Sequence, residues 1–262
     1  MKKLFSIIVA MAMLLMSCTV FAATDISDGV IRVEGTGSLM NANSITGYRA
    51  AKVDAMRNAL EEVQGVNIDS DTTVRDSITA SDMVRTRVNG MIKGAKVVKK
   101  YRDDDGYHVI IELPVYGVQS LASAVIPKTY TASAPVPFAP ATTYAPAPKI
   151  PVSSGPYTGL IVDCTGLGLE TAMAAGVFTP DNQMVYGKDN FSYEDVISRG
   201  YVGYARSLTS GVDRAGSNPL IIRAQSIKQF VNPVISNADA ARIMVENQQT
   251  KFLEKGNVVF VK

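Results

Sequence analysis

The stretch ITGYRAAKVDAMRNALEEV, residues 45–63, decides the fold of the N-terminal half. Its small and apolar side chains recur at intervals of three and four, which places them on one face of a helix. That face consists of Ala51, Ala55, Met56, Ala59, Leu60 and Val63. Gly65 follows and ends the helix. Because alanines one turn apart let a helix backbone approach a neighbour closely, the stretch predicts a helix packed against a sheet.

The segments around this helix supply the sheet. Val30–Glu34 has strand composition and ends in the turn Gly35-Thr36-Gly37. Lys96–Tyr101 and Tyr107–Tyr116 flank a tight turn and predict a β-hairpin. The apolar residues Ile78, Met83 and Val88 predict a second, weaker helix over Asp76–Met91.

Three adjacent aspartates, Asp103, Asp104 and Asp105, form the hairpin turn with Gly106. Such a cluster raises the question of calcium binding. An EF-hand loop spaces its ligands at alternate positions and closes with a distal glutamate, and that pattern is missing. A solvated turn without a metal is expected.

The C-terminal half alternates strands with helices. Its expected elements are a strand at Tyr157–Cys164, a hairpin at Gly176–Tyr186, a helix opened by Ser192 and Asp195, a strand at Pro219–Ile227, a helix at Ala238–Glu254 and a strand at Asn257–Val261. The Ser236-Asn237-Ala238-Asp239 run is a capping signal for the last helix. This order predicts an α+β sandwich.

A proline-rich stretch separates the halves. Residues 119–156 hold eight of the twelve prolines and no acid. Proline favours an extended chain over a packed core, so the stretch predicts a Pro/Ala-rich linker. The fold class is therefore α+β: two small α/β sandwich domains with helices on mixed or antiparallel sheets, residues 26–118 and 157–262, each with its own core.

The chain begins with an export signal. Lys2 and Lys3 precede an apolar run, and small residues follow at 20–22, which together predict a signal peptide over residues 1–22 with cleavage after Ala22. A competing interpretation is lipidation at Cys18, since Leu15-Met16-Ser17-Cys18 is similar to a bacterial lipobox. Met16 is bulkier than that pattern prefers, which slightly favours the soluble form. Either way the mature protein works outside the cytoplasm, in the periplasm or at the outer membrane of a bacterium.

Charge and cysteine content exclude several classes. Loss of residues 1–22 removes two lysines and no acid, so the formal charge of +2 becomes zero. A neutral chain lacks the clustered basic surface that nucleic acid requires. Cys164 is then the only free thiol, and one cysteine cannot form an internal disulfide.

Reactive constellations are sparse. His108 is the single histidine, and a lone strand histidine is usually structural. It could activate Cys164 only if the two halves met face to face. Gly166-Leu167-Gly168 follows a strand as in a dinucleotide fingerprint, but Thr171 replaces the third glycine and no room remains for the phosphate-binding helix. We expect a tight bend there, no cofactor and no metal.

The run Tyr48–Leu60, with Gly65-Val66 and Gly90-Met91-Ile92-Lys93-Gly94, resembles the twenty-kilodalton outer-membrane lipoprotein (Lpp) family and the N-terminal domain of flagellar assembly protein T. The resemblance covers about residues 29–118 and implies an α/β domain of an envelope protein. Its motif positions are Arg49, Ala51, Asp54, Ala55, Arg57, Leu60 and Gly65. The alanines have packing roles, and Asp54 can pair with either arginine.

These patterns favour a non-enzymatic, exported protein that acts in binding or assembly in the cell envelope. The resemblance implies a role at a flagellar or other surface structure. The alternative is a periplasmic module that binds a small ligand or a cell-wall component. Expected partners are envelope proteins, with outer-membrane attachment through a lipid on Cys18 as an option and no nucleic acid. Self-association stays open.

Overall fold

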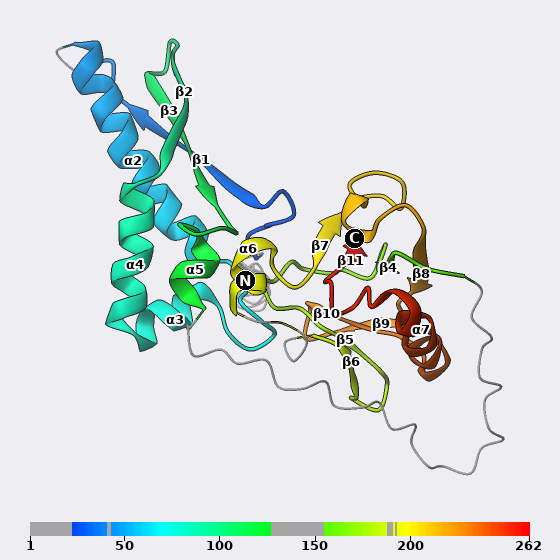
Figure 1. The fold of residues 1–262 in the computed structure, drawn as a ribbon. Helices are drawn as coiled ribbons and strands as arrows, with labels where there is room; N and C mark the ends of the chain where they lie inside the picture. Colours follow the sequence, from blue (N-terminus) through cyan, green and yellow to red (C-terminus); the bar gives the residue numbers. More distant parts are fainter. Residues whose placement is uncertain (1–22, 41–42, 127–154, 188–190, 192) are drawn as a thin grey trace, which may run out of the picture.

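The computed structural model describes residues 23–40, 43–126, 155–187, 191 and 193–262. The predicted signal peptide, with Cys18 and Ala22, and most of the predicted linker lie outside the described residues. Figure 1 shows two units side by side, an N-terminal one built on a hairpin and a long helix, and a C-terminal one with two sheets. The fold is α+β, as the sequence predicts.

The N-terminal unit is a three-stranded antiparallel sheet covered by helices. Its strands are β1 (Val30–Gly37), β2 (Lys96–Arg102) and β3 (Tyr107–Pro114), in the order β1-β3-β2. Its helices are α2 (Ser44–Gln64), α3 (Val74–Ala80), α4 (Asp82–Lys93) and α5 (Leu121–Val125). The predicted hairpin is confirmed. The predicted strand is present, but the turn expected at Gly35-Thr36-Gly37 is wrong, because these residues continue β1 and pair with β3.

The helix α2 packs on β1 and β3 through the face that its alanines predict (Figure 1). Ala51, Ala55, Ala59 and Val63 have no exposed surface. The approach is so close that a Cβ on Gly35 would lie 2.0 Å from the Ala55 backbone nitrogen. Small residues on both sides of this contact are therefore what brings the helix onto the sheet.

The single second helix predicted over Asp76–Met91 is wrong, because two helices occupy this region. Ser81 lies between them with extended backbone, and its side chain accepts a hydrogen bond from Val84 N as the N-cap of α4. Serine favours such caps over helix interiors. Met83, counted as an apolar mark of the expected helix, is 63% exposed.

The C-terminal unit contains two four-stranded sheets. One has the order β7-β11-β4-β8 and consists of β4 (Gly159–Asp163), β7 (Gly203–Ala205), β8 (Pro219–Arg223) and β11 (Val258–Val261). The other has the order β6-β5-β10-β9 and consists of β5 (Val177–Phe178), β6 (Met184–Tyr186), β9 (Ser226–Lys228) and β10 (Asn232–Val234). The helices are α6 (Tyr193–Arg199), the 3-10 turn η2 (Asp213–Ala215) and α7 (Asn237–Thr250).

Two details of this unit differ from the prediction. All pairings in the sheet of β4 are parallel, whereas mixed or antiparallel sheets were expected. The strand predicted over Pro219–Ile227 is two strands in different sheets, because the chain turns at Ala224 and Gln225 between β8 and β9. The hairpin at Gly176–Tyr186 and the cap at Ser236 are confirmed, and the expected Ser192 cap lies outside the described residues.

The two units share one apolar core. A single cluster of buried side chains runs from Ile26 and Val63 in the first unit to Met173 and Phe260 in the second. The prediction of two separate cores is wrong on this point. The linker also begins later than residue 119, because Leu121, Ala122 and Val125 of α5 are buried in that cluster. In the described part of the chain, no helix is long and apolar enough to cross a membrane.

Candidate functional site

The contact between the units, called the seam below, is formed first by residues 23–29, which we call the strap. The backbone nitrogen of Thr24 donates to Gly65 O at the end of α2. Ile26 is 1% exposed, and its backbone nitrogen donates to Thr171 Oγ1 of the second unit at 3.1 Å. Asp25 forms an ion pair with Lys262 at 2.7 Å. The strap therefore bonds to both units.

Backbone pairing forms the second part of the seam. Asn67 of the first unit forms a parallel β-bridge with Ala172 of the second. Met173 N donates to Asn67 O at 3.1 Å, and Ala174 N donates to Ile68 O at 2.7 Å. Hydrogen bonds of this kind fix register as well as distance, so the seam holds the units in one relative position.

Tyr116 forms the third part. Its ring reaches the second unit at Gly200, where a Cβ would lie 2.5 Å from the ring. Gly117 N donates to Ile197 O of α6 at 2.6 Å. Among the described residues, the buried Tyr116 hydroxyl has no hydrogen-bond partner, and burial raises the pKa of Tyr116 well above its usual range. An unpaired buried hydroxyl costs about 1–3 kcal/mol, so apolar packing of the ring must outweigh it.

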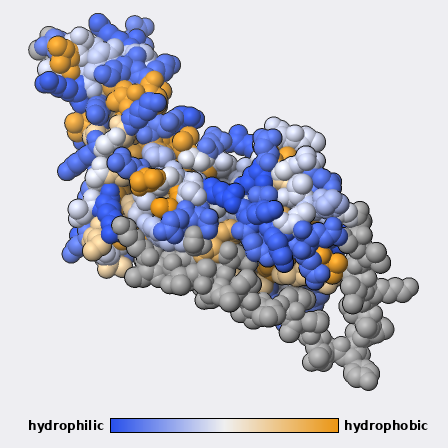
Figure 2. Space-filling view, in the orientation of Figure 1, coloured by the Kyte–Doolittle hydropathy of each residue, from blue (hydrophilic) through white to orange (hydrophobic). Residues whose placement is uncertain are grey.

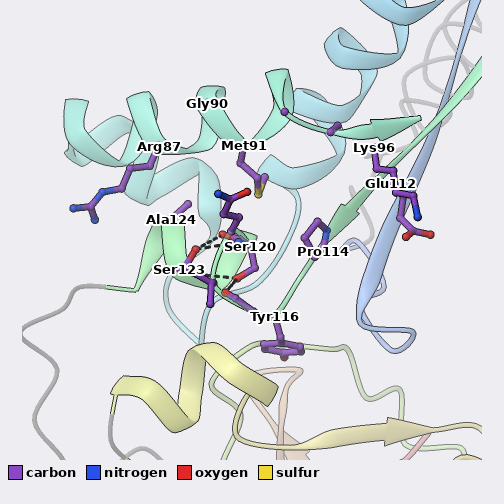
Figure 3. Close-up of a pocket in the computed structure, with 15 residues that line it drawn as sticks. Arg87, Gly90, Met91, Lys96, Glu112, Pro114, Tyr116, Ser120, Ser123 and Ala124 are labelled. Atoms are coloured by element: carbon purple, nitrogen blue, oxygen red, sulfur yellow. Dashed lines mark hydrogen bonds between the residues drawn. The ribbon is translucent and has the colours of Figure 1, made fainter. Parts of the chain in front are cut away.

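A cleft of about 700 Å³ opens above Tyr116 (Figure 3). One wall is α4, which presents Gly90 and Met91, and the opposite wall is α5 with Ser123 and Ala124. The volume lies within the range of roughly 300–1,000 Å³ that ligand sites occupy. Beside Gly90 the cleft is open, since a Cβ built there would meet no atom within 4 Å.

The chemistry of the cleft is mainly apolar with charges at its margins. Figure 3 shows Met91 pointing from α4 toward Ser120, while Arg87 is directed away from the centre. Lys96 and Glu112 lie opposite each other across β2 and β3. Ser120 and Ser123 use their hydroxyls to cap α5, as Ser120 Oγ accepts from Ser123 N and Ser123 Oγ accepts from Ser120 N. The cleft can accept an apolar group, and no side chain in it is arranged as a nucleophile with a base.

The single histidine lies at the far end of the sheet, in the hairpin. His108 Nδ1 is 2.7 Å from Glu34 Oε1, and Nε2 is 2.9 Å from Asp103 Oδ1. The ring stacks on Tyr101 with centroids 4.5 Å apart, and Tyr101 donates its hydroxyl to Glu34. Carboxylates of Glu34 and Asp103 thus occupy both ring nitrogens of His108.

This arrangement shifts the titration of its members. Partial burial of the ring favours neutral imidazole, but the hydrogen bonds and charges of Asp103 and Glu34 outweigh it and raise the pKa of His108. The hydrogen bond from Tyr101 lowers the pKa of Glu34, and the same bond raises the pKa of Tyr101 to about 12. The turn is exposed, as the sequence predicts, and Asp103 in addition fixes its shape, because its Oδ1 also accepts from Gly106 N.

The remaining residues of the predicted motif have packing, pairing and capping roles. Asp54 pairs with Arg57 at 3.7 Å and accepts from Thr36 N at 3.0 Å, while Arg49 is exposed on α2. Leu60 is partly buried against the core, and Gly65 caps α2. The motif residues therefore pack and cap, and they do not form a common site.

Cys164 is buried far along the chain from the hairpin that holds His108, at the end of β4. Burial raises the pKa of the Cys164 thiol to about 12, so the reactive thiolate is scarce at neutral pH. Gly166 and Gly168 have φ of +77° and +72°, which confirms the predicted tight bend after the strand.

Sequence reasoning missed the seam and the cleft. The sequence predicts Tyr116 as the last residue of a strand. Asn67 and Gly200 belong to no motif that would indicate a contact between the halves. The buried helix α5 could have been found from the apolar run Leu121–Ile126, which interrupts the proline-rich composition.

Both units are similar to known families. Residues 32–114 match the LPP20 lipoprotein family. This matched range runs from within β1 to the end of β3 and includes the His108 cluster and the α4 wall of the cleft. Residues 159–262 match the second domain of Treponema pallidum Tp0624. No curated protein matches the chain.

The match to the LPP20 lipoprotein family supports the predicted lipoprotein-family resemblance and an exported, envelope-associated protein. Together the matches leave residues 115–158 between two modules, and that interval contains Tyr116, α5 and the predicted linker. One cleft wall and the seam tyrosine thus lie outside both matched ranges.

Proposed function

We propose that the chain is a non-enzymatic envelope protein that acts by binding or assembly, and that it receives a partner in the cleft between α4 and α5. The observation that carries this proposal is the position of Tyr116, which lines the cleft and packs on Gly200 of the second unit. A partner in the cleft therefore contacts a surface that both units hold in place.

The chemistry of the two most reactive side chains supports a role without catalysis. His108 has both ring nitrogens bonded to carboxylates, and the Cys164 thiol has a raised pKa. A general base needs a free nitrogen near its substrate, and a cysteine nucleophile needs a low pKa. Neither condition is met, so His108→Ala and Cys164→Ser variants that fold should retain function.

The test fills the cleft without touching the core. In Gly90→Tyr, the new side chain enters open space beside α4, and the helix gains propensity. Thr86→Tyr, on an exposed position of the same helix, is the matched control. We expect the first variant to lose complementation of a deletion strain while the second retains it, with Gly90→Tyr melting at or above the temperature of the control. Full complementation by Gly90→Tyr would overturn the cleft as the contact surface.

A second candidate function is capture of a small ligand or a cell-wall component in the same cleft. It is favoured by the cleft volume of about 700 Å³ and the adaptable Met91 side chain. Purified protein would be titrated with soluble cell-wall fragments while its melting temperature is measured. A rise that Gly90→Tyr abolishes supports this function over a protein partner.

The narrower proposal, a role at the flagellum, is supported by the resemblance of Tyr48–Leu60 to the flagellar assembly protein. Its test is the motility of a deletion strain complemented with the wild-type chain. Normal motility in the deletion strain would exclude a role at the flagellum. It would not affect the proposal of an envelope protein that acts by binding or assembly. Attachment through a lipid on Cys18, with the outer membrane as its location, is tested by the intact mass of the exported protein.

A further inference from the structure

Residues 83–102, which form most of α4 and all of β2, contain seven cations and no acid. The cations are Arg85, Arg87, Lys93, Lys96, Lys99, Lys100 and Arg102. In the part of the chain that the structure describes, only Arg85 of this set forms an ion pair, with Asp82. A charge count over the whole chain, which is nearly neutral, therefore misses a local concentration of positive charge that is free to meet an anionic partner.

Most of the unpaired cations lie on an open sheet edge. The order β1-β3-β2 leaves the outer edge of β2 without a neighbouring strand among the described residues, and every residue of β2 keeps some exposed surface. Figure 1 shows the β2–β3 hairpin projecting from the N-terminal unit, away from the C-terminal unit. Figure 2 shows a mainly hydrophilic surface with a few apolar side chains at this projecting end. The edge therefore presents backbone hydrogen-bonding groups and positive side chains together.

Two features of β2 act against pairing with another copy of itself. Lysines on an edge strand repel a second basic edge. The register irregularity between Val97 and Lys99 interrupts the first half of the strand. Neither feature excludes an extended chain of opposite charge, and protection of the edge does not account for Arg87 and Lys93, which lie on α4. The surface therefore favours an acidic chain over a copy of this one.

The regular half of β2, residues 99–102, determines which acidic pattern fits. Lys100 and Arg102 are two positions apart, so their side chains lie on the same face of the sheet. The other face carries Tyr101, whose ring centroid lies 4.7 Å from Lys99 Nζ. An added strand with acids at alternate positions places these acids beside Lys100 and Arg102. Its remaining side chains then lie beside the Tyr101 ring.

The neighbours of this edge limit the acidic segment at one end and lead it to the cleft at the other. Asp103, Asp104 and Asp105 form the exposed hairpin turn that follows β2, and they repel further acids there. At the other end of β2, Lys96 lines the cleft between α4 and α5. A partner with an apolar group in the cleft can therefore continue along β2 as an extended acidic segment.

We propose that β2 receives an extended, acidic segment of a partner protein, which adds to the sheet as a fourth strand beside residues 99–102. This inference rests on the proposed function, because it names the chemistry of the partner that binds the cleft. Backbone hydrogen bonds to the edge provide affinity, and the cations select for acids. An anionic lipid surface would contact the cations but has no backbone groups to pair with the edge.

The test is a titration of the mature chain with a fluorescent hexapeptide of alternating glutamate and valine, measured by anisotropy. Lys100→Glu with Arg102→Glu should weaken binding about 10-fold or more, because each reversal replaces an attraction with a repulsion. Lys251→Glu with Lys255→Glu, at exposed positions of the C-terminal unit, changes the net charge equally and should leave the affinity unchanged. A peptide with lysine in place of glutamate should bind the first variant more tightly than the wild type.

A second peptide separates strand addition from charge attraction alone. Methylation of all its amide nitrogens keeps the charges but removes the backbone donors, and should weaken binding to the wild-type chain about 10-fold or more. Equal binding of the two peptides would overturn the proposal. So would a wild-type chain that binds phosphatidylglycerol vesicles but not the unmodified peptide, since the cations would then serve a lipid surface.

The peptide assay and the cleft test fail separately. Gly90→Tyr fills the cleft and should leave peptide binding unchanged, because residues 99–102 do not line the cleft. Lys100→Glu with Arg102→Glu should lose complementation of the deletion strain. If this variant complements fully although it no longer binds the peptide, the acidic segment is excluded and the cleft proposal stands.

Discussion

The two units of this chain bury their sheets in different ways. The N-terminal sheet is antiparallel: β2 and β3 are consecutive in a hairpin, and β1 pairs with β3. The C-terminal sheet of β4 is parallel, and its adjacent strands β4 and β11 come from the two ends of the unit. Local pairing leaves a strong sequence pattern, whereas parallel pairing of distant segments leaves only short apolar runs.

The comparison is tested most strongly where the first unit packs backbone against backbone. Gly35→Ala places a methyl group into the Ala55 backbone and should lower the free energy of unfolding by ~1–3 kcal/mol or more. Gly90→Ala adds the same methyl to open space in a helix and should raise it by up to ~1 kcal/mol. Chemical denaturation of both variants measures the two effects. Equal changes in the free energy of unfolding would show that the close contact between α2 and β1 does not stabilise this unit.

The seam between the units gives the next largest effect. Gly200 has φ of +68°, and its Cβ would meet Tyr116. Gly200→Ala should therefore destabilise the folded chain by ~1–2 kcal/mol through backbone strain and displacement of the ring. Gly211→Ala, with φ of +76° and only ordinary contacts to Ala205, is the control for strain alone. If both substitutions cost the same, the Tyr116 contact adds nothing to the seam.

The stability of the hairpin should fall both at high pH and at low pH. His108 has a raised pKa, so its stabilisation is complete below about 6.5 and disappears as pH rises through the raised pKa. Glu34 and Asp103 have lowered pKa values, so their contribution is present above about 4 and disappears as pH falls through those values. The melting temperature should be highest between these limits. His108→Gln should flatten the alkaline side of the profile, and an unchanged profile would refute the ion-pair account.

The smallest effect is expected from cutting the predicted linker. A protease should cleave within the predicted Pro/Ala-rich linker, residues 119–156. Because the shared core and the Asn67–Ala172 bridge hold the units together, the fragments should co-elute without denaturant. Separation of the fragments would mean that the seam depends on the covalent connection.

The sequence predicts the first unit well because its signals are local. The alanine face of α2, the Asp-Asp-Asp-Gly turn and the caps each specify their own segment. The break at Ser81 was missed because a serine is compatible with both a helix interior and a cap. The strand boundary at Ala224 was missed for another reason: Leu220 and Ile227 look alike in sequence although they belong to different sheets.

The candidate site is harder to predict because it arises from packing between distant segments. Nothing in the residues around Tyr116 indicates that its ring would meet Gly200, more than eighty positions later. The cleft is open where its lining residues are small, at Gly90 and Ala124. Small residues of this kind form no sequence motif that would predict a cleft. The sequence could identify His108 and Cys164 as reactive residue types, but not that carboxylates bond both nitrogens of His108 or that Cys164 is buried.

The helix α2 also fixes a distance. Its 21 residues span about 31 Å at 1.5 Å per residue. Its C-terminal end is bonded to the strap, and its first turn packs beside the hairpin, where Gly47 lies against the Tyr107 ring. The helix thus sets the distance between the seam and the hairpin. Two bodies engaged at its two ends would be held about 31 Å apart, because the packing of α2 on β1 and β3 fixes the position of both ends.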